Sequence, residues 1–271
     1  MKLYLSILAS YLTILSFAQD TFQFKNVLNP NSSYLMSVHN AIDMSLEFVG
    51  IEENNYKSKT VNDIEIKTIS QNKDQQGNVP FELFYTKVKS KSSFNGEDLP
   101  SNDQFLEALS DVKIKGIDKP TGRVFTGYEG LEENKKMFDI LFDSFKNLIV
   151  YPKETFKIGQ THQVTNSISS PLPGGMNLSL DFNTAYTLTK IENGKAFFDV
   201  IMKANNDSNQ ATAIKINIKK YNVKGDLWVD LEDNNISEMN AKGPNVMELE
   251  ADGMNVIMSS ENILNIQSKK L

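Results

Sequence analysis

Apolar and polar residues alternate along most of this chain with a period of two, the pattern of β-strands that bury one face. In the longest run, residues 176–188, nearly every second residue is bulky. The bulky positions of this run and of the next segment are Met176, Leu178, Leu180, Phe182, Tyr186 and Leu188, then Ala196, Phe198, Val200 and Met202. Between them lies Asn193-Gly194, a pair that favours a type I′ turn because both positions accept positive φ. The pattern predicts a long β-hairpin.

Similar but shorter alternation recurs through the rest of the chain. It covers Ile42 to Phe48, Ile64 to Ile66, Phe81 to Tyr85, Ile214 to Ile218, and Met247 to Met258 around Asp252-Gly253. Most of the connecting segments are short, which favours antiparallel pairing of neighbouring strands.

Two segments have the period of a helix instead. Residues 131–149 place Met137, Ile140, Leu141, Phe145 and Leu148 on one face and charged residues on the other. This predicts an amphipathic helix of about four turns, which Pro152 prevents from running on. Residues 102–109 predict a shorter helix, since Ser101 and Gln104 have the spacing of a capping box.

The chain also shows signs of an internal duplication. Met44–Phe48 resembles Leu178–Phe182, and the hairpin predicted over Glu65–Lys89 resembles that over Thr184–Lys203. Chance likeness among repetitive β patterns is the alternative. We predict a signal segment at 1–18, a first β half at 19–130, a bridging helix at 131–150 and a second β half at 151–271. The expected fold is all-β: one large curved antiparallel sheet or open barrel, with the amphipathic helix packed on it.

The first 18 residues have the pattern of a secretory signal. Lys2 is followed by an apolar run to Phe17, and Ser16 and Ala18 are small residues suited to cleavage after Ala18. An uncleaved anchor is the alternative, but the run is shorter than the ~20 residues that cross a bilayer. The chain has no cysteine for lipid attachment. We expect a periplasmic or extracellular protein with no transmembrane segment after cleavage.

Charge and motifs exclude several functions. The net charge of −6 argues against nucleic acid, because phosphate binding needs a basic face. No nucleophile elbow, zinc-protease motif or phosphate-binding glycine loop occurs. The two histidines, His39 and His162, have no recognisable catalytic partners beside them. Asp226, Asp230, Glu232 and Asp233 form an acidic cluster that lacks the EF-hand pattern and is better explained by turn chemistry. We expect no enzyme activity, no cofactor and no metal.

A resemblance to a known family rests on the segment after the predicted helix. Tyr151-Pro152-Lys153 and Ile158-Gly159-Gln160-Thr161-His162, with two β halves and a signal ending Phe-Ala-Gln, resemble a family of secreted Bacteroidetes proteins that is itself a domain of unknown function. Gln160 and His162 replace the family's usual Asp and Trp. The resemblance implies no activity and no functional residues. The family's sheets are loosely similar to the half-barrels of periplasmic lipoprotein and lipid carriers.

The composition therefore favours binding over catalysis. Methionines crowd the second half, and methionine adapts to irregular apolar ligands, although the same residues would also fill a packed core. The residues expected to line an apolar site are Met137, Leu141, Phe142, Phe145, Met176, Phe182 and Met202. We expect a non-enzymatic protein that binds a lipid or another apolar or amphiphilic envelope molecule between sheet and helix. The alternative is a structural or protein-partner-binding envelope protein with a packed core, whose partner would be another envelope protein.

Overall fold

The computed structural model describes residues 21–25, 27–51, 55–100, 108–119, 122–130, 151–172, 176–205, 214–251 and 254–271. These residues are almost entirely β-strand, and none of their helical residues forms a segment that could cross a membrane. The predicted signal segment 1–18 and the predicted helix 131–149 lie outside the described residues. Of the shorter predicted helix, only Ala108 and Leu109 are described, and both are helical.

Twelve strands form one antiparallel sheet. They are β2 (Ser33–Phe48), β3 (Asn55–Ser70), β4 (Val79–Phe94), β5 (Glu97–Asp98), β6 (Lys113–Lys119), β7 (Gly122–Glu129), β9 (Thr161–Leu172), β10 (Met176–Glu192), β11 (Lys195–Asn205), β12 (Ile214–Asp230), β13 (Ile236–Ala251) and β14 (Met254–Lys270). Two further short strands, β1 (Thr21–Phe22) and β8 (Phe156–Lys157), pair with each other beside the sheet.

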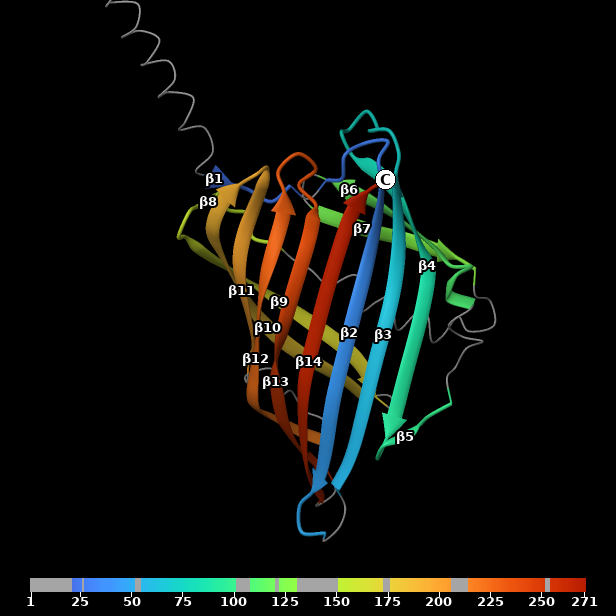
Figure 1. Cartoon of the computed structure of the whole chain (residues 1–271), viewed down its shortest axis with the longest axis vertical. Coiled ribbons are helices and arrows are strands. Elements are labelled where there is room, and N and C mark those ends of the chain that lie inside the picture. The colour runs from blue at the N-terminus through green and yellow to red at the C-terminus, as the bar shows by residue number, and fades with distance from the viewer. Residues whose placement is uncertain are drawn as a thin grey trace, which may run out of the picture.

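The strand order joins two meanders in the middle of the sheet. From edge to edge it runs β7-β6-β4-β3-β2-β14-β13-β12-β11-β10-β9, with β5 added to β4. The first and last long strands, β2 and β14, pair along their full length, from Tyr34 opposite Lys270 to Phe48 opposite Val256. The sheet is strongly curved (Figure 1). Among the described residues its edge strands β7 and β9 do not pair, so the sheet is not closed. The predicted fold class, a large curved antiparallel sheet, is confirmed.

The hairpin turns follow local residue chemistry. Asn193 and Gly194 have φ of 52° and 74°, and β10 and β11 pair up to Glu192 and Lys195 on either side. Two successive positive φ values are the signature of a type I′ turn, so this prediction is confirmed. At the other predicted hairpin, Ala251 pairs with Met254.

One meander spans β2 to β7 and the other spans β9 to β14, and the segments compared in the sequence do not follow the same strand order in the two. In the first half, Met44–Phe48 lies in β2, and the hairpin over Glu65–Lys89 that follows it lies in β3 and β4. Leu178–Phe182 instead lies in β10, the same strand that enters the Asn193-Gly194 turn. The duplication therefore stays a prediction.

A packed aromatic core fills the inner face at the upper end of Figure 1, where β2 begins and β14 ends. Phe198 is 1% exposed, and its ring centroid lies 5.2 Å from that of Phe22 and 5.1 Å from those of Phe24 and Phe156. Leu188, fully buried, belongs to the same cluster. The segments around β1 and β8 therefore cover this end of the sheet.

Two glycines allow a close approach between β12 and β13. A Cβ atom at Gly225 would lie 2.1 Å from the carbonyl oxygen of Asn240, and one at Gly243 would lie 2.1 Å from that of Asn222. These are backbone atoms that cannot rotate away. Only glycine fits at both positions, which lets the two strands bend together.

Candidate functional site

The inner face of the sheet changes character from its upper to its lower end. The registers show which side chains share a level: Leu46 lies opposite Met258, and Met258 lies opposite Met247. Following these rows downward gives a packed upper core, then a row of polar side chains, then apolar side chains again. The polar row and the lower apolar row form the candidate site.

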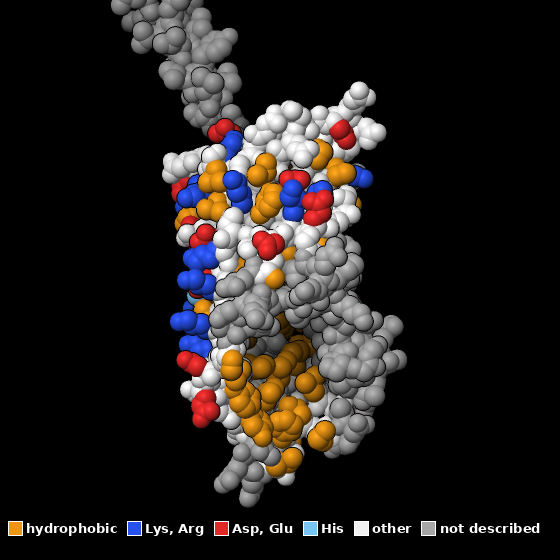
Figure 2. Space-filling model, turned by 90° about the vertical axis from the view of Figure 1, so that its right-hand side faces the viewer, with side chains coloured by type: hydrophobic (Ala, Val, Ile, Leu, Met, Phe, Trp, Pro, Cys, Tyr) orange, Lys and Arg blue, Asp and Glu red, His pale blue; other side chains and the backbone are white. Residues whose placement is uncertain are grey.

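The lowest layer is an apolar hollow. Its partly exposed inner side chains are Met44, Leu46, Phe48, Tyr56, Leu249, Val256 and Met258. In the upper core, by contrast, inner side chains such as Tyr34 and Ile66 are 3% and 5% exposed. Figure 2 shows hydrophobic side chains lining a depression in the lower half of the molecule. The side chains of this layer are thus less enclosed than those of the upper core, although Leu249 and Met258 pack against the buried residues Ile218 and Met247.

The wall of the hollow on β10 to β12 is formed around Tyr221. The Phe182 ring lies 4.9 Å from the Tyr221 ring, and the Tyr221 hydroxyl donates a hydrogen bond to the Met202 sulfur at 3.5 Å. Burial raises the pKa of the Tyr221 phenol above its usual range, so it is a neutral donor at physiological pH. Ile218 and Met247 are buried beside it.

The structure thus brings together two of the residues expected to line an apolar site, Phe182 and Met202. Four others, Met137, Leu141, Phe142 and Phe145, lie outside the described residues. Met176 lies in β10, but its side chain is not described. Whether any of them contacts a ligand stays a prediction.

The sequence pattern did not indicate Tyr221 as a residue of the apolar site, because a β-bulge in β12 changes which residues face inward. Ile218, an even-numbered residue of β12, points to the inner face, and the register shifts between Ile218 and Lys220. From Tyr221 onward the odd-numbered residues point inward, as buried Leu227 and Val229 show. The change of apolar phase along residues 214–229 was a signal in the sequence that could have located it.

Between core and hollow lies a polar belt, whose inner-face side chains are Asn40, Thr60, Asn62, Ser90, Ser92, Asn166, Thr184, Asn245, Ser260 and Asn262. Asn166 and Thr184 are 8% and 1% exposed. The buried oxygen atoms Asn166 Oδ1, Thr184 Oγ1 and Asn245 Oδ1 have no hydrogen-bond partner within the described part of the chain. Each such atom costs about 1–3 kcal/mol when left unpaired.

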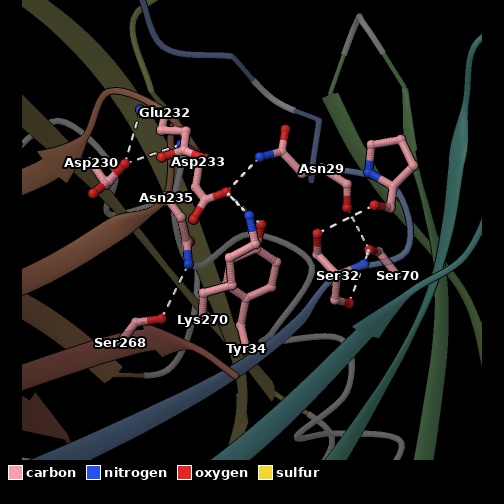
Figure 3. A network of polar contacts seen from close by, with 11 residues as sticks. Asn29, Ser32, Tyr34, Ser70, Asp230, Glu232, Asp233, Asn235, Ser268 and Lys270 are labelled. Atoms are coloured by element: carbon pink, nitrogen blue, oxygen red, sulfur yellow. Dashed lines mark hydrogen bonds and ion pairs between the residues drawn. The ribbon is translucent and has the colours of Figure 1, made fainter. Parts of the chain in front are cut away.

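A separate polar network ties the chain together at the upper end (Figure 3). Asp233 Oδ1, in the β12–β13 turn, accepts hydrogen bonds from Asn29 Nδ2 at 2.5 Å, the Tyr34 hydroxyl at 3.3 Å and Lys270 Nζ at 2.8 Å. The hydrogen bond to Asp233 raises the pKa of Lys270. Because this network joins β2, the last strand β14 and the β12–β13 turn, its role is structural.

The acidic cluster has the turn chemistry expected of it. Asp230 Oδ1 accepts hydrogen bonds from the backbone N–H groups of Glu232 at 2.9 Å and Asp233 at 3.1 Å. Asn234 has a φ of 49°, the left-handed conformation that asparagine tolerates in turns. In the described ranges, no group of three or more acidic, histidine or cysteine residues is arranged to hold a metal.

The two histidines lie on opposite faces of the sheet. His39 is on the outer face, where its Nδ1 lies 2.7 Å from Asp63 Oδ1. His162 is on the inner face opposite buried Tyr186, and its ring meets Phe156 edge-on with centroids 4.6 Å apart. Along with Tyr151, which stacks on Phe24, His162 thus belongs to the upper core. These residues of the family-like segment serve packing.

A shallow groove of about 610 Å³ lies on the outer face, over β3, β2, β14 and β13. Its lining includes the charged residues Asp43, Lys57, Lys59 and Glu261. It differs in chemistry from the apolar hollow, which is formed by the inner-face residues of the same strands.

No family model and no curated protein matches this chain. The resemblance to the secreted Bacteroidetes family therefore stays a prediction. Among solved structures, the chain is similar to lipovitellin, in a structure described as showing lipid–protein interactions, with 12% identity and a TM-score of 0.50. The match covers 89% of this chain and 26% of lipovitellin, so the chain spans about a quarter of that protein.

Two bacterial structures match with much lower similarity. The translocator domain of the autotransporter NalP from Neisseria meningitidis gives 9% identity, a TM-score of 0.19, and coverage of 87% of this chain and 88% of that domain. OccK5 from Pseudomonas aeruginosa gives 8% identity, a TM-score of 0.22, and coverage of 89% of this chain and 99% of that protein.

Of these matches, the lipovitellin match shows the fold, a large curved antiparallel sheet. It is consistent with the predicted likeness to lipid-carrier sheets.

Proposed function

We propose that this protein is a non-enzymatic binder of an apolar or amphiphilic molecule, and that it works in the periplasm or outside the cell. The observation that carries the proposal is the apolar hollow beneath the packed upper core. A sheet whose inner side chains are packed at one end and partly exposed at the other presents apolar surface that a ligand can bury. The fold likeness to lipovitellin supports the same function.

Burial of an acyl chain sets the scale of the affinity. Burying one methylene group contributes about 0.8 kcal/mol, so about ten methylenes contribute roughly 8 kcal/mol, which by itself corresponds to a Kd of about 1 μM. Association losses of about 4 kcal/mol or more weaken this towards the millimolar range. Such binding suits a carrier, which must also release its ligand.

Titration with Nile red, an uncharged apolar fluorophore, tests the proposal. The unmodified protein should enhance and blue-shift the fluorescence in a saturable way. Leu46→Glu places a charge on the inner face of β2 and should weaken binding at least tenfold, because a carboxylate in an apolar site is costly. Ser45→Glu, its neighbour on the outer face, adds the same charge and should change the affinity less than twofold. Lack of saturable binding by the unmodified protein, or equal losses in both variants, would contradict the proposal.

A second candidate function, binding a protein partner, is favoured by exposed apolar side chains at the lower turns. Val49, Ile51 and Met254 are 49%, 50% and 54% exposed, and the turns that carry them are joined by a hydrogen bond from Val49 N to Asn255 O. The double variant Ile51→Ser, Met254→Ser separates the two functions. It should leave Nile red binding unchanged if the hollow is the site, and abolish binding of an envelope partner if these turns are.

A further inference from the structure

We propose that the ligand is an amphiphile with an uncharged polar group rich in hydrogen-bond donors, which binds the polar belt while its chain lies in the apolar hollow. This proposal rests on the proposed function and names the class of ligand. Long-chain alcohols, monoacylglycerols and fatty amides have this chemistry.

The belt offers buried oxygen atoms that accept no hydrogen bond from the described residues. Asn166 lies opposite Phe182 on β10, and Thr184 lies two residues further along β10, opposite Val164. Both side chains are more than nine-tenths buried, and neither Asn166 Oδ1 nor Thr184 Oγ1 has a partner in the part of the chain that the structure describes. Phe182 also forms the wall of the hollow with Tyr221. The unused polar atoms therefore lie directly beside the apolar surface that would hold the chain.

Asn245 extends the belt across the sheet. It lies opposite Ser260 on β14 and opposite Tyr221 on β12, and its Oδ1 is a third buried oxygen without a described partner. Met247, two residues further along β13, is buried in the next row down. On both sides of Tyr221, a buried polar side chain therefore lies next to an apolar one that is nearer the lower end of the sheet.

Among the described residues, the belt contains no charged side chain. Its inner-face residues are asparagines, serines and threonines, interspersed with apolar residues and Gly243. A carboxylate, phosphate or ammonium group placed here would lose its hydration, and no described residue of the belt would supply an opposite charge. An uncharged hydroxyl or amide would instead donate to the unused oxygens. The absence of charge selects the class of headgroup.

The packed core sets the depth at which the polar group stops. Directly above the belt, Tyr186 and Val200 are 5% and 3% exposed, and Leu188 and Phe198 fill the next row. A ligand entering the hollow therefore cannot pass beyond the belt. It binds with its polar group leading and its chain towards the lower end.

Competition against bound Nile red at pH 8 tests this proposal with two ligands that share an 18-carbon chain, monooleoylglycerol and oleate, each below its aggregation concentration. Monooleoylglycerol should displace the dye at a concentration at least tenfold lower than oleate does. Thr184→Val and Asn166→Leu should each weaken monooleoylglycerol binding about fivefold to tenfold, the value of one hydrogen bond, while the affinity for Nile red stays within twofold. Thr187→Val, on the outer face of β10, is the matched control and should have no effect.

The outcomes separate this proposal from the proposed function. If oleate competes as well as monooleoylglycerol, or if the belt variants bind monooleoylglycerol normally, the headgroup assignment is overturned while the binding function stands. If neither Nile red nor either lipid binds, the proposed function itself fails. The comparison of the two lipids needs only the unmodified protein, so it decides the matter even where a variant does not fold.

Discussion

Replacing Leu188 and Leu46 by alanine, one at a time, compares the packed core with the hollow. Both leucines point to the inner face of the sheet, Leu188 from β10 and Leu46 from β2. Leu188 is fully buried among the aromatic rings of the upper core, whereas Leu46 is partly exposed in the hollow. The same chemical change is therefore made in a filled and in an open environment.

The magnitudes follow from these environments. Leu188→Ala removes apolar area and leaves a cavity that the surrounding rings cannot close, so it should lower the free energy of unfolding by about 2–5 kcal/mol. Leu46→Ala creates no enclosed cavity, and part of its side chain already contacts solvent. Leu46→Ala should therefore lower the free energy of unfolding by about 1 kcal/mol, a fraction of the 1.5–3 kcal/mol that full burial of a leucine contributes.

Urea unfolding of the ligand-free protein measures both values, with the slope of the transition checked for each variant. The ligand must be removed first, because bound ligand stabilises the folded state by mass action. Equal losses of several kcal/mol in both variants would refute the reasoning, since they would mean that the lower layer is as tightly packed as the core. In that case the hollow would not be available to a ligand.

Three further predictions concern the scaffold. Asp118→Ala should lower the free energy of unfolding, measured in urea, by about 2–3 kcal/mol. The fully buried Asp118 carboxylate accepts hydrogen bonds from Arg123 Nε at 2.7 Å and from Leu28 N at 3.0 Å, and the partial exposure of Arg123 keeps the loss below that of a fully buried pair. Gly194→Val should cost roughly 1–3 kcal/mol, because a β-branched residue cannot easily adopt the φ of 74°, and an unchanged unfolding midpoint would show that the turn tolerates it. Burial raises the pKa of Tyr186 to about 12, above the ~10 of an unfolded tyrosine, so its contribution to stability is complete below pH ~10 and is lost as the pH rises towards 12. Unfolding midpoints between pH 9 and 12 should therefore fall more steeply for the parent than for Tyr186→Phe.

Much of the sheet was predictable because strand alternation and turn chemistry are local properties. The hairpin over Asn193-Gly194 is the clearest case, since the residue pair determines the turn and the turn determines the register of β10 and β11. The order of the strands was not predictable in this way. The pairing of β2 with β14 joins segments more than 200 residues apart, and no turn residue marks it.

The candidate site was only partly predictable for a related reason. Phe182 and Met202 stand in strictly alternating runs, so their inner-face position followed from the sequence. Tyr221 follows a bulge that reverses the alternation, and its place beside them depends on that irregularity. The polar belt was not recognised because asparagines and serines in separate strands form a layer only once the registers are known.

Native mass spectrometry of the protein purified from the cells that produce it naturally, followed by organic extraction and identification of what is released, tests the central claim most directly. We predict that one uncharged amphiphile accompanies the folded protein in a fixed ratio, and that Leu46→Glu is purified with less of it than Ser45→Glu. The contradicting result is a folded parent protein that carries no amphiphile and takes up none when vesicles or dispersed lipids are supplied.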